Sequence, residues 1–155
     1  MSKRNLTLLT DLYELTMMQG YFHAKDANET VIFDAFYRTN PDGNGFAITA
    51  GLEQVVEYIE NLHFDKEDID YLRTTGLFGE DFLEYLSTFK FTGDIYAIPE
   101  GTVVFPREPL VKVIAPIMQA QLVETAILNI NNHQSLIATK TTRIVHAARG
   151  DGDME

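Results

Sequence analysis

The chain has 155 residues, a net charge of −11 from 23 acidic and 12 basic residues, and no cysteine. An acidic chain repels nucleic acid phosphates and anionic membrane surfaces, so we expect neither as a partner. The lack of cysteine excludes disulfides and cysteine-ligated metals. No apolar run reaches the ~20 residues that span a bilayer, and no signal peptide is visible, so we expect a cytoplasmic protein.

The first predicted element is a helix that is capped by Thr10 and runs to about Ala24. Its apolar residues form two stripes rather than one: Leu12, Leu15, Met18 and Phe22, and beside them Tyr13, Met17, Gly20 and Tyr21. A surface helix needs only one apolar face. The second stripe therefore predicts contact with a partner outside this chain.

A strand over 30–37 follows, because this segment is rich in β-branched and aromatic residues. Residues 40–45 carry dense turn chemistry, and 46–48 would form a return strand, which predicts a hairpin. Gly43 and Gly45 lack the third glycine and the strand-to-helix context of a dinucleotide site, so the turn is the favoured interpretation.

Three helices are predicted next. Apolar spacing indicates one over 52–62. A second is capped by Asp65 with Asp68 at its third position and ends at Gly76, and a third covers 80–88.

Three short β segments are then predicted, over 94–98, 102–105 and 110–114. Helices follow from Pro116, with a break near Asn131 and Asn132. The order of elements indicates an α+β fold, with an α+β domain over 1–115, connecting helices over 116–149 and a flexible end over 150–155.

No complete catalytic constellation is visible. The four histidines lack metal-ligand spacing, so we predict no metal site. Arg38 follows a predicted strand, where its guanidinium either reaches a phosphate or carboxylate or simply flanks a surface turn. Tyr13 either stacks on a flat ring or packs on the second stripe.

Several segments together resemble the nicotinate phosphoribosyltransferases, in family order and over nearly the whole chain. These segments are Leu8–Met18, Phe36–Pro41, Gly45–Ile48 with Gly51–Glu53, Phe91–Asp94, Ile98–Pro106 and Gln121–Thr125. The resemblance implies the N-terminal domain of the type II phosphoribosyltransferase fold, with helices packed on a small, mostly antiparallel sheet and without the α/β barrel that follows it in the family.

The family makes nicotinate mononucleotide from nicotinate and phosphoribosyl pyrophosphate in NAD biosynthesis, using ATP and Mg²⁺, and works as a head-to-tail dimer. The resemblance implies that this chain binds no cofactor by itself, forms a homo-oligomer and is inactive alone, because most catalytic groups lie in the barrel.

Individual residues carry over by motif. Tyr13 resembles the aromatic that stacks on the pyridine ring held by the neighbouring subunit, and Asp11 its acidic companion. Arg38 resembles the basic residue that reaches toward substrate phosphates. Lys140 and Arg143 are further candidates, with simple exposure to water as the alternative.

The chain departs from the family pattern at Asn129–Asn132, Thr141, Thr142 and Asp153, where apolar or small residues are expected. One hypothesis is a solubilised fragment whose barrel-facing surface is exposed to water. The alternative is natural sequence drift. A different class of function is a carrier module of the biotinyl or lipoyl type around Ile98–Gly101. The turn there holds Glu100 and Gly101 but no modifiable lysine, which disfavours it.

Overall fold

The computed structural model describes residues 5–24, 27–40, 43 and 45–149. Their elements are α1 (Leu12–His23), β1 (Thr30–Phe36), β2 (Ala47–Ile48), α2 (Leu52–Glu60), α3 (Lys66–Thr74), α4 (Glu80–Ser87), β3 (Asp94–Ala97), β4 (Val103–Val104), β5 (Pro109–Pro116) and α5 (Ile117–Ala148). The predicted α+β class is confirmed: in these ranges, helices accompany two small antiparallel sheets and no barrel is closed.

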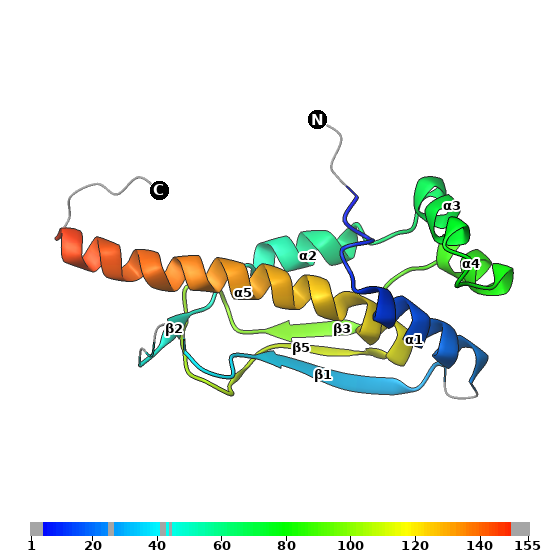
Figure 1. Cartoon of the computed structure of the whole chain (residues 1–155). Coiled ribbons are helices and arrows are strands. Elements are labelled where there is room, and N and C mark those ends of the chain that lie inside the picture. Colours follow the sequence, from blue (N-terminus) through cyan, green and yellow to red (C-terminus); the bar gives the residue numbers. More distant parts are fainter. Residues whose placement is uncertain (1–4, 25–26, 41–42, 44, 150–155) are drawn as a thin grey trace.

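Helix α5 and a three-stranded sheet form the centre of the molecule. Figure 1 shows α5 running across the sheet, with α1 beside its first turns and α2 along its middle. β5 lies between β1 and β3. The buried face consists of alternate β5 residues and one stripe of α5: Val111, Val113, Ala115, Met118, Leu122, Val123, Ala126 and Ile127. The elements α1, α2, β1, β2 and β3 pack against this central unit.

The predicted hairpin between β1 and β2 is wrong. β1 pairs with β5, with Ile32 opposite Ile114, and β2 pairs with β4 in a separate sheet. The long apolar run of β5 offers β1 seven residues of pairing and a buried face, which the two residues of β2 cannot. The β1–β5 register shifts between Ala35 and Phe36. Such an irregularity bends a strand, and here it precedes Tyr37 and Arg38.

Helix α1 has the predicted extent but not the predicted cap. Asp11 is the N-cap residue, without a side-chain cap bond, and the Thr10 hydroxyl instead donates to the Glu14 carboxylate. Leu12 is 54% exposed although it belongs to the stripe expected to face inward. On the second stripe, Tyr13 is 51% exposed, which leaves an uncovered aromatic face in the described part of this chain.

The break predicted in the last helical region is absent, and α5 is one helix of 32 residues. Two of its buried polar residues, Ser135 and Thr139, bond to a neighbouring segment and do not end the helix. The Ser135 hydroxyl accepts from the Ala50 backbone N–H at 2.9 Å, and the Thr139 hydroxyl accepts from that of Ile48 at 2.8 Å. These hydroxyls accept hydrogen bonds from backbone N–H groups of β2 and of the segment that follows it. Their hydrogen-bonding capacity is therefore used without interrupting the helix.

The idea that the departures from the family pattern face water is wrong for Asn131, which is only 6% exposed. Thr142 is exposed and Thr141 is half-buried. Asp153, like the flexible end expected over 150–155, lies outside the described residues.

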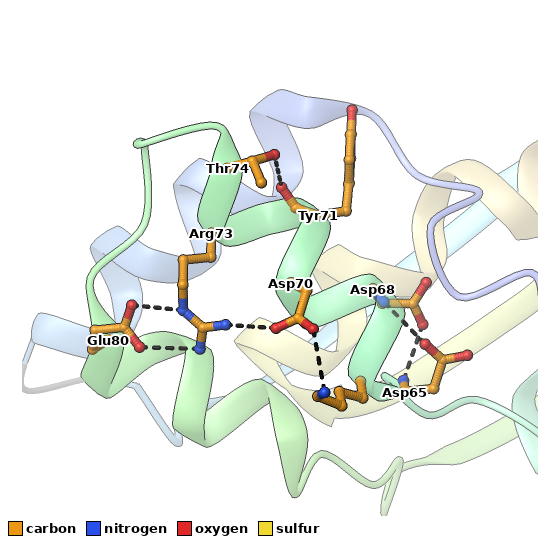
Figure 2. A network of polar contacts seen from close by, with 8 residues as sticks. Asp65, Asp68, Asp70, Tyr71, Arg73, Thr74 and Glu80 are labelled. Carbon is orange, nitrogen blue, oxygen red and sulfur yellow. Dashed lines mark hydrogen bonds and ion pairs between the residues drawn. The ribbon is translucent and has the colours of Figure 1, made fainter.

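Figure 2 shows two sets of polar contacts, a cap at the start of α3 and a bridge between α3 and α4. The predicted cap is confirmed: Asp65 accepts from the Asp68 backbone at 2.9 Å, and the Asp68 side chain accepts in return from the Asp65 backbone at 3.0 Å. The Arg73 guanidinium bridges Asp70 and Glu80, each at 2.8 Å. The exposed guanidinium bridge links the two helices but adds little to stability.

Gly93 lies where the chain enters β3, and an added Cβ would come within 2.4 Å of the Ala115 side chain and 2.7 Å of the Ile114 carbonyl. We expect Gly93→Ala to lower the free energy of unfolding by about 1–3 kcal/mol, because β5 is packed too tightly to move. Gly20→Ala is the control: Gly20 is in α1 with open space around it, so alanine should stabilise by about 0.5–1 kcal/mol. Urea denaturation of both variants checks the pair, and equal effects would contradict this account of β5.

Candidate ligand groove

An open groove of about 800 Å³ lies between the start of α1, the end of β1 and the first half of α5. Its described lining residues are Asp11, Tyr13, Asp34–Thr39, Leu110, Glu124, Thr125, Leu128, Asn129, Asn131 and Asn132. Four segments, from α1, β1, β5 and α5, therefore meet at one concave surface.

The groove brings together Asp11, Tyr13 and Arg38, the three residues that the family resemblance selected. Asp11 and Tyr13 come from the first turn of α1, and Arg38 follows the register shift at the end of β1. Lys140 and Arg143 are on the second half of α5 and are not among the lining residues.

The buried carboxylate of Glu14 lies next to the groove residues of α1. Glu14 is 0% exposed, and it accepts hydrogen bonds from Thr10 and, at 2.9 Å, from Thr125 of α5. The Tyr13 hydroxyl lies 3.4 Å from the same Glu14 oxygen, and Thr125 is also 3.4 Å from Asp11. Glu14 and Thr125 therefore connect the groove residues of α1 to α5.

Negative charge surrounds the Tyr13 ring. Desolvation raises the pKa of the Tyr13 hydroxyl, and the carboxylates of Glu124, Glu14 and Asp11 raise it further. Asp34 is paired with Lys112 at 3.3 Å. Among the described lining residues, Arg38 is the one basic side chain, so an anionic group of a ligand is best placed at the Arg38 end.

Sequence reasoning missed Glu14, Thr125 and Asn131 as parts of this wall. A signal for Glu14 exists in the spacing, because Glu14 precedes the buried Met18 by four residues and so shares its face. Thr125 and Asn131 carry no such signal, since their role depends on how α5 meets α1 and β1.

Within the described ranges, no three His, Asp or Glu side chains are grouped closely enough to hold a metal ion. No helix in those ranges is long and apolar enough to cross a membrane. The observed arrangement is that of an α+β domain with an open groove on one face.

Comparison with known proteins identifies this class of domain. The nicotinate phosphoribosyltransferase (NAPRTase) N-terminal domain family matches residues 8–132. Nicotinate phosphoribosyltransferases of Mycobacterium tuberculosis and Bacillus subtilis are 50% and 46% identical over 143 and 140 residues, which is 92% and 90% of this chain. The chain spans 31% and 29% of those relatives' own lengths.

The crystal structure of human nicotinic acid phosphoribosyltransferase superimposes with a TM-score of 0.84 at 33% identity, covering 94% of this chain and 29% of the human one. A nicotinate-nucleotide pyrophosphorylase from Pyrococcus furiosus, 21% identical with a TM-score of 0.69 over 96% of this chain and 31% of its own, shares the fold. The chain belongs to the nicotinate phosphoribosyltransferase N-terminal domain family.

Burial raises the pKa of Glu14 above its ordinary value of 4.5, and the two threonine hydroxyls only partly offset it. A raised folded-state pKa gives a stabilising contribution that is complete below the unfolded value and is lost as pH rises through the folded one. The glutamine of Glu14→Gln stays neutral at every pH. The difference in free energy of unfolding between this variant and the unmodified chain should therefore change in favour of the variant between about pH 4 and pH 8.

Urea denaturation across that range measures the difference. Glu84→Gln, which removes an exposed carboxylate from α4, controls for the change in net charge. A relative stability of Glu14→Gln that does not change with pH, or that falls as pH rises, would contradict the buried carboxylate.

Proposed function

We propose that this chain forms the N-terminal domain of an enzyme that transfers a phosphoribosyl group to nicotinate in NAD biosynthesis. In this proposal the domain completes the nicotinate pocket of a partner subunit within a cytoplasmic homodimer. ATP, Mg²⁺ and phosphoribosyl pyrophosphate bind to the remainder of the enzyme. Membership of the family supports the reaction, and the groove supports the role of this domain.

The convergence of Asp11, Tyr13 and Arg38 on one groove carries the proposal. A half-exposed aromatic ring offers a stacking surface for a flat pyridine ring. A guanidinium on the same groove suits the carboxylate of nicotinate or a phosphate of the second substrate. Fixed positions of these groups reduce the entropy lost when the substrates are aligned.

Exposed apolar side chains on the two elements that frame the groove support a partner there. Leu12, Tyr13 and Met17 of α1 and Ile32 and Phe36 of β1 are each at least 40% exposed. Several exposed apolar side chains on neighbouring elements are typical of an interaction surface. A neighbouring barrel laid over them would close the open side of the groove.

The carrier-module alternative lacks support in the turn that suggested it. Glu100 accepts a hydrogen bond from the Gly51 backbone N–H at 2.6 Å and lies 3.4 Å from that of Glu53. The turn therefore caps the start of α2, and β3 pairs with β5 rather than across the turn with β4.

Replacement of the matching part of the Bacillus subtilis relative by residues 8–132 gives a full-length enzyme in which Tyr13 is tested. We expect Tyr13→Ala to raise the KM for nicotinate by up to about tenfold, because a stacking surface is lost. Tyr13→Phe keeps the ring and should stay near the parent value. Steady-state kinetics with nicotinate as the varied substrate measures both.

Tyr71→Ala is the matched control, since Tyr71 is an exposed tyrosine on α3 outside the groove. Mixing Tyr13→Ala subunits with subunits whose barrel site is disabled should restore activity if the ring acts across the dimer. The 155 residues alone should show no turnover with nicotinate, phosphoribosyl pyrophosphate, ATP and Mg²⁺. An unchanged KM in Tyr13→Ala would overturn the stacking role.

A further inference from the structure

Asn131 carries an unused hydrogen-bond donor just behind the lining of the groove. The residue lines the groove and is only 6% exposed. Its side-chain Nδ2 is buried and has no hydrogen-bond partner. A buried amide donor left unpaired is costly, so its presence at a concave surface indicates an acceptor that the free chain does not supply.

The neighbours of Asn131 are already committed elsewhere. The Tyr37 hydroxyl donates to the backbone carbonyl of Asn132 at 3.3 Å and lies 3.5 Å from that of Asn131. The helix supplies the backbone bonds of Asn131 itself. Tyr37 is buried and immediately precedes Arg38, so the ring places the Arg38 segment against the turn of α5 that carries Asn131.

We propose that the side-chain amide of Asn131 is a further ligand-binding group of this groove, and that it turns toward the groove when a ligand binds, so that Nδ2 donates to an anionic oxygen of a carboxylate or phosphate. The inference rests on the proposed function, because it takes the groove to be a substrate site. Both oxyanions offer the acceptor that the amide lacks. Arg38, on the same groove, supplies the positive charge that draws an anion there.

This role accounts for an asparagine where the family resemblance leads to an apolar residue. An apolar side chain of similar volume would remove the unpaired donor and stabilise the free chain. In the bound state, a ligand oxygen that accepts a hydrogen bond from the amide makes asparagine more favourable than an apolar residue. Stability of the free chain and affinity for the anion should therefore change in opposite directions.

The test uses the 155-residue chain and Asn131→Leu. We expect Asn131→Leu to raise the Tm by about 2 °C or more, because an unsatisfied buried group is removed. The same change should weaken binding of the preferred anion about tenfold, because a hydrogen bond to a charged oxygen is lost. Nicotinate, inorganic phosphate and uncharged pyridine are titrated at constant ionic strength, with ¹H–¹⁵N NMR of the Asn131 side-chain amide as the readout.

Asn129→Leu changes an exposed asparagine of the same helix and should not raise the Tm. A shift of the Asn131 amide with nicotinate but not with phosphate assigns the donor to the carboxylate, and the opposite result assigns it to phosphate. Pyridine should perturb the Tyr13 ring without moving the Asn131 amide.

The inference and the proposed function fail in different ways. If nicotinate perturbs Tyr13 but the Asn131 amide does not shift and Asn131→Leu binds equally well, the inference is wrong and the stacking role stands. If phosphate shifts the amide while neither nicotinate nor pyridine perturbs Tyr13, the stacking role loses its support and the anion site stands. A lowered Tm in Asn131→Leu, or no shift of the amide with any anion, overturns the inference.

Discussion

The packing of one long helix against the sheet is the interaction on which the rest of this fold depends. Its first half buries an apolar stripe on β5 and touches α1, and its second half binds the segment that contains β2. The hydroxyl of Thr125 bonds to Glu14 of α1, and the hydroxyls of Ser135 and Thr139 bond to β2 and the segment that follows it. The helix therefore aligns segments that are not joined to one another by a common sheet.

The groove is a product of that alignment. Its lining includes the carboxylates of Asp11, Asp34 and Glu124 and the guanidinium of Arg38, so one concave surface carries charges of both signs. A buried carboxylate behind Tyr13 is costly to ionise, and the domain retains it where α1 meets α5. Such a group beside an open groove indicates that fixed geometry there takes precedence over maximum stability.

Local signals in the sequence predicted the helices and most strands, because capping residues, apolar spacing and turn residues act over a few positions. The pairing of β1 was missed, since it depends on β5, more than 70 residues later. Tyr13 and Arg38 were found through family resemblance, whereas Asn131 was interpreted as a residue facing water. Its burial follows from the long-range contact of α5 with β1, which no periodicity encodes.

The unbroken course of α5 has a consequence for how this domain tolerates changes in length. Successive residues of a helix are separated by about 100° of rotation and 1.5 Å of rise. Insertion or deletion of a single residue between Thr125 and Ser135 would turn every later side chain away from its present neighbour. The contacts of its two halves therefore constrain the number of residues between them as well as the residue types.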